Sequence, residues 1–410
     1  MSIETIPIEC RTLTYKTLNL PGDIKVPILL DLHFSPSAIR QNLATKNDLN
    51  LACLCYFHGG GLVVGDRKSW FPKWLSERIT AAGHVFISPD YRLIPSGSTT
   101  SHEVLEDVQD VFQFISGLAL DISSEEFSIS PSNSNTLSFR IDPDRIAASG
   151  SSAGANCAYL AAMHANPKPK AVLSMYGQGG NFLIPHYYAV KHSVFLRGRE
   201  MLDPNLFPEF LYPAPTVTDR SRPITGSPNT YFPPESPADS VPIPGSSDNT
   251  GPPGFPSNRR MFLGRLYLQM GRFLDYYTGE HDPSLSVALR RHAEDLRSTP
   301  LSDSNDATVS TALANIIPEK HRHLFPSLCS PAEYASWPPV YFFHGSLDSA
   351  VPIQESYHLH DLLHEAGVSP VMSIAEGMEH SFDYEPGAED VHREEFDKIQ
   401  DWLDQFLRQQ

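Results

Sequence analysis

Short apolar runs alternate along the chain with longer segments in which apolar residues recur at helical spacing. The short runs predict strands at residues 12–17, 25–34, 51–57, 85–91, 146–149, 171–176, 340–343 and 371–375. The helical spacing predicts helices at residues 69–82, 103–115, 153–165, 353–365 and 390–406. Because strands joined through helices pair in parallel, this alternation predicts an α/β fold with a mostly parallel sheet.

Two segments interrupt the alternation. Residues 121–140 are rich in Ser and other polar residues, which favours a surface loop. The longer interruption covers residues 178–334, and its part from 204 to 257 holds 14 of the 36 Pro residues. Proline resists both helix interiors and central strands, so we expect this part to be an extended or mobile excursion.

Helical spacing returns at residues 259–313. The pattern therefore predicts a core made of residues 1–177 and 335–410, with residues 178–334 inserted as a largely helical cap. Aromatic residues crowd this insertion. We expect most of them to pack the cap onto the sheet and some to line an apolar pocket.

Composition excludes several classes of protein. The 410 residues carry a formal net charge of −17, which argues against nucleic-acid or anionic-membrane partners. No signal-peptide pattern opens the chain, and no apolar run approaches the ~18 residues of a membrane span, so we expect a soluble, cytoplasmic protein. The five Cys form no paired CxxC motif, and Cys53 and Cys55 alternate on a predicted strand as core residues do, so we expect no metal site.

The sequence GSSAG at residues 150–154 lies where a predicted strand meets a predicted helix. That context is typical of a nucleophile elbow, in which Ser152 would occupy the tight turn. Gly150 and Gly154 carry no side chains, so strand and helix could approach closely there. The alternative is that Ser151 or Ser152 simply caps the helix.

A serine nucleophile needs a base and donors for the oxyanion, and candidates for both occur elsewhere in the chain. His58-Gly59-Gly60-Gly61 directly follows the apolar run 51–57, and consecutive glycines let backbone N–H groups turn inward; a merely flexible loop is the alternative. Asp348 and His380 each follow a predicted strand near the C-terminus, where catalytic groups of open α/β sheets gather. His380 could instead be an ordinary surface histidine.

These motifs resemble the α/β-hydrolase superfamily and, within it, the hormone-sensitive-lipase-like esterases. The resemblance is carried by HGGGLVVGD (58–66), DYRLIP (90–95), DPDRIAASGSSAG (142–154), PPVYFFHGSLD (338–348) and EGMEHSFDY (376–384). It covers roughly residues 45–177 and 335–408. It implies an eight-stranded, mostly parallel sheet flanked by helices, with a helical cap over the active site.

The resemblance also assigns roles to residues. It implies a nucleophile, a base and an orienting acid at Ser152, His380 and Asp348. It implies that the oxyanion is bound by the backbone N–H groups of Gly60, Gly61 and Ala153. Support for these motifs is implied for His58, Gly59, Gly150 and Gly154, with His58 tying down the glycine loop.

Three features depart from the family pattern. Ser151 stands where an acidic residue commonly precedes the nucleophile, and DYRLIPSGS replaces DYRLAPE. The insertion is also much longer than the family's cap, where substrate selectivity usually lies. These departures bear on the natural substrate more than on the mechanism.

We therefore expect a carboxylesterase-type serine hydrolase that acts on a small apolar ester and needs no cofactor. An alternative is a specialised biosynthetic enzyme acting on a polyketide-like ester, thioester or lactone. A remote alternative is a non-catalytic small-molecule receptor. The sequence leaves the oligomeric state open.

Overall fold

A nine-stranded sheet forms the centre of the molecule. The computed structural model describes residues 8–43, 49–122, 137–219, 222–236, 252–298 and 306–408. Its strands are β1 (Glu9–Leu20), β2 (Ile24–Phe34), β3 (Leu49–Phe57), β4 (Val85–Pro89), β5 (Ala119–Ile122), β6 (Leu137–Ser151), β7 (Val172–Met175), β8 (Val340–Gly345) and β9 (Val371–Ala375). Eight of them follow the order β1-β2-β4-β3-β6-β7-β8-β9, and β5 pairs with β6. From β4 to β9 this eight-stranded path is parallel, as predicted, while β1 and β2 are antiparallel.

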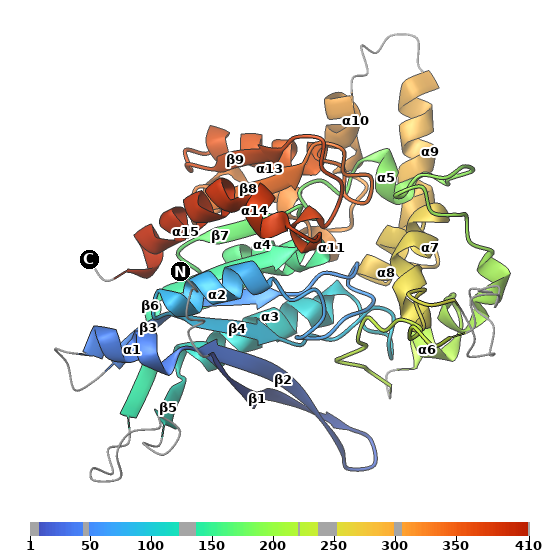
Figure 1. Ribbon diagram of the computed structural model, residues 1–410. Coiled ribbons are helices and arrows are strands. Elements are labelled where there is room, and N and C mark those ends of the chain that lie inside the picture. Colours follow the sequence, from blue (N-terminus) through green and yellow to red (C-terminus); the bar gives the residue numbers. More distant parts are fainter. Residues whose placement is uncertain are drawn as a thin grey trace.

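Helices cover both faces of the sheet because the central strands are apolar on both sides. On β3, Leu54 and Tyr56 belong to the buried cluster that includes residues of α2 (Lys73–Ala81) and α15 (Arg393–Leu407). Cys53 and Cys55 point to the other face and belong to the cluster that includes residues of α3 (Ser101–Ser116), α4 (Ala153–His164) and α13 (Gln354–Glu365) (Figure 1). Both cysteines are fully buried, as expected of core residues. Within the described ranges, every helix is too short or too polar to cross a membrane.

The helices and loops differ from their predicted bounds in three places. The helix predicted at 69–82 begins at Lys73, because Pro72 occupies the cap position. The final helix is divided at His392 into α14 (Ala388–Val391) and α15. The surface loop predicted at 121–140 is wrong at its ends, where residues 119–122 pair with 137–140 as antiparallel strands. Residues 123–136 lie outside the described residues.

The insertion between β7 and β8 is built from short helices. They are α5 (Pro185–Tyr188), α6 (Pro215–Thr218), α7 (Leu263–Gln269), α8 (Phe273–Thr278), α9 (Leu285–Ser298), α10 (Asp306–Leu313), α11 (Glu319–Arg322) and α12 (Pro331–Tyr334). In the Pro-rich part, the described residues form α6, short 3₁₀ turns and irregular chain, and residues 237–251 lie outside the description. Buried aromatic residues from the insertion join the core on the α3 and α4 face. The division into core and cap domains stays a prediction.

Arg260 ties the insertion to the core. It lies in the 3₁₀ turn Arg259–Phe262 and is only 8% exposed. Its guanidinium donates to the carbonyl oxygens of Val63, Ile94 and Pro95 at 2.7, 2.9 and 3.0 Å. Burial lowers the pKa of Arg260 to about 10, so the group remains charged at neutral pH and makes charge-assisted hydrogen bonds.

Replacing Arg260 with Met should destabilise the protein. The apolar side chain keeps most of the packing but leaves three buried carbonyl groups without donors, which we expect to cost about 2–4 kcal/mol in the free energy of unfolding. Urea unfolding measures this loss. Arg393→Met, which removes an exposed arginine from α15, is the matched control and should change stability by less than about 0.5 kcal/mol. Equal effects of the two substitutions would contradict the assigned role.

Candidate active site

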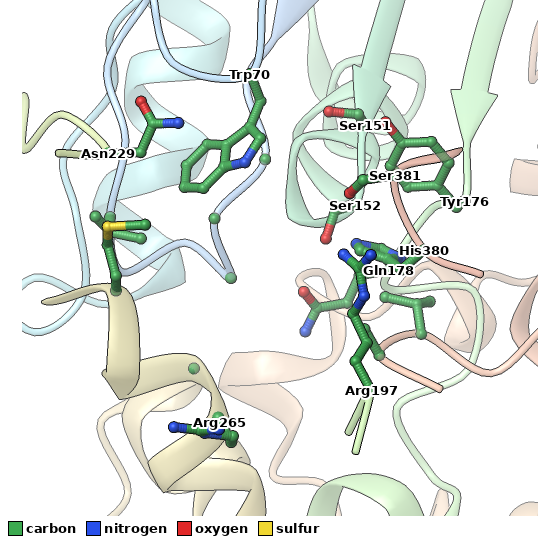
Figure 2. A pocket seen from close by; sticks show the side chains of 18 of the residues that line it. Trp70, Ser151, Ser152, Tyr176, Gln178, Arg197, Asn229, Arg265, His380 and Ser381 are labelled. Atoms are coloured by element: carbon green, nitrogen blue, oxygen red, sulfur yellow. The ribbon is translucent and has the colours of Figure 1, made fainter. Parts of the chain in front are cut away.

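Ser152 occupies a strained turn between β6 and α4. Its backbone has φ 54° and ψ −124°, a conformation that costs an L-residue about 1–3 kcal/mol. Backbone hydrogen bonds hold the turn: the Ser152 N–H donates to Met175, and its carbonyl accepts from Ala155 and Gln178 at 3.1 and 2.9 Å. The Ser152 side chain makes no capping bond to α4. Ser152 is therefore not a helix cap. Its hydroxyl points into the adjacent cavity in Figure 2.

Two glycines make this turn possible. A Cβ atom on Gly150 would lie 2.1 Å from the carbonyl oxygen of Gly154. A Cβ atom on Gly154 would lie 2.0 Å from the carbonyl oxygen of Phe57, at the end of β3. Both distances are far below van der Waals contact, so no other residue fits these positions without movement of the backbone.

The glycine loop lies beside the turn. Gly60 and Gly61 have φ values of 103° and 66°, and an added Cβ on Gly59 would stand 3.3 Å from the Cβ of Ser152. The N–H groups of Gly60, Gly61 and Ala153 donate none of the hydrogen bonds found between described residues. These three donors therefore remain available to an oxygen atom bound near Ser152.

His58 is buried beneath the loop. Its ring stacks on Tyr91 with centroids 4.4 Å apart, and the Tyr91 hydroxyl donates to the His58 carbonyl at 2.8 Å. Burial lowers the pKa of His58 to about 4, so the ring is neutral at pH 7. Its Nδ1 lies 2.7 Å from the Gly59 carbonyl oxygen, which can only accept, so Nδ1 carries the proton. This geometry suits the supporting role expected from the sequence.

The loops after β8 and β9 bring Asp348 and His380 together. Nδ1 of His380 lies 2.7 Å from Oδ2 of Asp348. The other carboxylate oxygen accepts the N–H groups of Ala350 and Val351 at 2.9 and 2.8 Å. Nε2 of His344, a residue that the sequence reasoning did not single out, lies 3.2 Å from Oδ2.

These contacts keep Asp348 ionised. Burial alone would raise the pKa of its carboxyl group, but attraction to His380 and hydrogen bonds from His344 and His380 outweigh burial. The pKa of Asp348 therefore lies well below its usual range. An ionised acid on Nδ1 of His380 leaves Nε2 as the nitrogen available for exchanging protons with a substrate or nucleophile.

Ser152 and His380 line one cavity of about 740 Å³, together with Gly59, Gly60 and Gly61. Figure 2 shows Ser152 and His380 on the same side of the cavity, opposite Trp70. The insertion supplies the facing wall through residues of α7 and of the segment before it. The structure thus brings together all the residues assigned from the sequence, and their catalytic roles stay a prediction.

Comparison with known proteins bears on the fold of the chain. A sequence profile described as alpha/beta hydrolase fold matches residues 54–206, and a profile of the prolyl oligopeptidase family matches residues 299–410. The chain has the α/β-hydrolase fold. A curated relative of this α/β-hydrolase, the probable carboxylesterase M8 of a Phoma species, is 30% identical over 152 residues. That match covers 36% of the present chain and 42% of the relative.

Solved structures show the same fold. An α/β-hydrolase superfamily protein of Enterococcus faecalis aligns with a TM-score of 0.52 and 14% identity, covering 96% of this chain and 99% of that one. Carboxyl esterase 2 of Tuber melanosporum aligns with a TM-score of 0.51 and 14% identity, covering 100% of this chain and 89% of that one. At such low identities the likeness extends to the fold of this α/β-hydrolase and not to its substrate.

A polar cluster missed by the sequence analysis lies behind Ser152 of this α/β-hydrolase. The hydroxyl of Ser151 is 2.7 Å from that of Tyr56, so it neither caps α4 nor supplies a charge. Nearby, Asp383 accepts hydrogen bonds from Tyr176 at 2.7 Å and from Trp74 at 3.1 Å. Burial raises the pKa of Asp383 to about 6. The sequence indicates Asp383 only weakly, through its position three residues after His380.

Glu355 is a second buried acid that sequence reasoning missed. It lies in the first turn of α13 and accepts hydrogen bonds from the Tyr187 hydroxyl and from the N–H groups of Gly179 and Asn181. Burial outweighs these hydrogen bonds and raises the pKa of Glu355 to about 8. Glu355 therefore joins the start of the insertion to the helix that follows Asp348.

A cluster with metal-ligand geometry lies away from the cavity, on β1 and β2. Ligand atoms of Cys10, Asp31 and His33 lie within 4.8 Å of one another. The guanidinium of Arg67 donates to Oδ1 of Asp31 at 2.8 Å and places a positive charge beside the cluster. That charge disfavours a cation there, and we assign no metal to this α/β-hydrolase.

Gly154→Ala should unfold the elbow. The added methyl group would meet the Phe57 carbonyl oxygen at 2.0 Å, so we expect a loss of about 3 kcal/mol or more in the free energy of unfolding. Gly117→Ala is the control, since its nearest contact would be 3.9 Å away and its φ is −101°. Denaturant unfolding of both variants measures the difference. A Gly154→Ala protein as stable as Gly117→Ala would contradict the close approach.

Glu355 should make stability depend on pH. Its folded-state pKa of about 8 exceeds the ordinary value of 4.5, so the folded protein holds a proton that the unfolded chain releases between these values. Its contribution to stability is complete below pH 4.5 and is lost as pH rises toward 8. From pH 5 to 8, wild type should therefore lose about 1.4 kcal/mol per pH unit more than Glu355→Gln.

Urea unfolding at several pH values tests this slope. Glu365→Gln, an exposed position on the same helix, is the control and should follow wild type across the range. If the Glu355→Gln curve ran parallel to wild type, Glu355 would not carry the proton.

Proposed function

We propose that this protein is a serine hydrolase that cleaves carboxylic esters through an acyl-enzyme. The observation that carries the proposal is the joint placement of Ser152, the Asp348–His380 pair and the glycine loop on one cavity. The relation to probable carboxylesterase M8 supports the same reaction class.

The first half of the reaction forms the acyl-enzyme. Nε2 of His380 takes the proton from the Ser152 hydroxyl as Oγ attacks the carbonyl carbon of the ester. Asp348 holds the imidazole in orientation through Nδ1 and stabilises the imidazolium. The bond to the alcohol oxygen then breaks, and His380 gives that oxygen its proton.

The second half regenerates the serine. A water molecule gives a proton to His380 and attacks the acyl carbon, and the carboxylic acid leaves as Ser152 recovers its proton. In both halves the negative oxygen of the tetrahedral intermediate would accept the N–H groups of Gly60, Gly61 and Ala153. Such donors are already in place before substrate binds, and losing one typically costs about 10²–10³ in rate.

The structural features argue for turnover rather than for passive binding. A strained serine persists only where its surroundings hold it, and here backbone hydrogen bonds from three segments do so. An ionised Asp348 paired with Nδ1 of His380 orients the imidazole and leaves Nε2 able to take a proton from a nucleophile, as catalysis requires. We therefore favour an enzyme over a receptor.

Ser152→Ala should abolish both covalent labelling and turnover. Wild type should react with a fluorophosphonate and hydrolyse p-nitrophenyl esters, whereas the variant should lose labelling and about 10⁴-fold or more of kcat. Gel fluorescence and absorbance of p-nitrophenolate provide the two readouts. Ser116→Ala on α3, far along the chain from the cavity residues, should label as wild type does. Absence of labelling in folded wild type would overturn the proposal and favour a receptor.

A further inference from the structure

The cavity beside Ser152 is rich in positive charge although the whole chain carries −17. Four cationic side chains line it: Lys68, Arg197, Arg199 and Arg265. Glu385 is the one Asp or Glu among the described lining residues. Because the protein as a whole is negatively charged, this local excess of positive charge points to an anionic ligand in the cavity.

The positive charges of Arg265 and Arg199 lie close together and are only partly compensated by their surroundings. Burial and the nearby Arg199 together lower the pKa of Arg265 to about 10, and Glu200 offsets this only in part. Arg199 is exposed at the rim of the cavity, and the part of its side chain that is buried, together with Arg197, lowers its pKa as well. No ion pair joins these arginines to an acid within the described part of the chain. An anion placed among them would relieve this repulsion.

Hydrogen bonds fix the position of the backbone at Arg197. Its backbone is left-handed, with φ 48°, and its N–H donates to the Ser349 hydroxyl at 2.8 Å. Ser349 in turn donates to Glu379 at 2.6 Å, and Glu379 accepts the N–H of His380 at 2.9 Å. The chain segment bearing Arg197 is thus fastened to both loops that carry the Asp348–His380 pair.

The side chain of Arg197 extends into the cavity. Figure 2 shows its guanidinium end directed toward Ser152 and His380, while Arg265 approaches from α7 on the other side. A guanidinium offers paired N–H donors that match the oxygens of a carboxylate or a phosphate. The remaining wall is partly apolar, with Val63, Trp70, Met261, Leu268 and Phe273.

We propose that Arg197, supported by Arg199 and Arg265, binds an anionic group of the substrate, so that this protein prefers esters bearing a carboxylate or phosphate over neutral esters. The inference rests on the proposed hydrolase function and names the substrate class of the same site. It amends the expectation of a purely apolar ester: the apolar wall would hold a carbon chain or ring, and the arginines would hold its charged end.

The kinetic test compares two esters of equal shape. Mono-p-nitrophenyl glutarate ends in a carboxylate, and p-nitrophenyl 5-methylhexanoate carries an isopropyl group in its place. Wild type should show the higher kcat/KM with the glutarate ester. Arg197→Met should lower the ratio of the two kcat/KM values about 10-fold or more, since a charge-assisted hydrogen bond is lost.

Two further variants sharpen the comparison. Arg393→Met makes the same change of net charge on exposed α15 and should leave the ratio at its wild-type value. Arg197→Lys keeps the charge but loses the paired donors, so its ratio should fall between the two. The proposal fails if Arg197→Met and Arg393→Met give the same ratio, or if wild type prefers the neutral ester.

A binding measurement keeps this inference separate from the proposed function. Calorimetric titration of Ser152→Ala with monomethyl glutarate needs no turnover, and binding should be lost when Arg197→Met is added. Binding without ester hydrolysis by wild type would uphold the anion site and overturn the hydrolase; hydrolysis of neutral esters without binding would do the reverse. Titration with inorganic phosphate shows whether the arginines accept a phosphate or select the carboxylate.

Discussion

The close approach of three backbone segments at the end of β3 is the constraint on which the site depends. Gly150 and Gly154 leave no room for side chains between β6, α4 and the end of β3. This contact places the first turn of α4 against the glycine loop and forces Ser152 into its left-handed conformation. The hydroxyl of Ser152 is thereby directed away from the core and into the cavity. Sterics at two positions thus decide where the chemistry can occur.

Electrostatics then divides the buried acids into different protonation states. Asp348 stays ionised because His380 and His344 both face its carboxylate. Glu355 and Asp383 accept hydrogen bonds only from neutral donors, so burial raises the pKa of both. At pH 7 Glu355, with a pKa of about 8, is therefore largely protonated, whereas Asp348 stays ionised beside His380.

The sequence predicts the parts of the structure that local chemistry determines. GSSAG and HGGG contain glycines that only particular backbone conformations require, and the chain order of Ser152, Asp348 and His380 limits the topology. The eight-stranded path follows from alternating apolar runs, but β5 does not, because its four residues carry little periodicity. The partnership of Tyr176 with Asp383 spans 207 positions, and that of Glu355 with Gly179 spans 176. Such contacts depend on how the elements pack, which no local pattern records.

Arg260 has a consequence for how such proteins can diversify. Its three acceptors belong to the core, on the segments that follow the glycine loop and the β4 strand, while the arginine itself belongs to the insertion. The insertion therefore cannot be replaced by an unrelated one without a change in the core as well. A different insertion lacking a cation at this point would leave carbonyl groups beside the glycine loop without hydrogen-bond donors. We therefore expect the insertion and the core segments that bind Arg260 to change together during evolution.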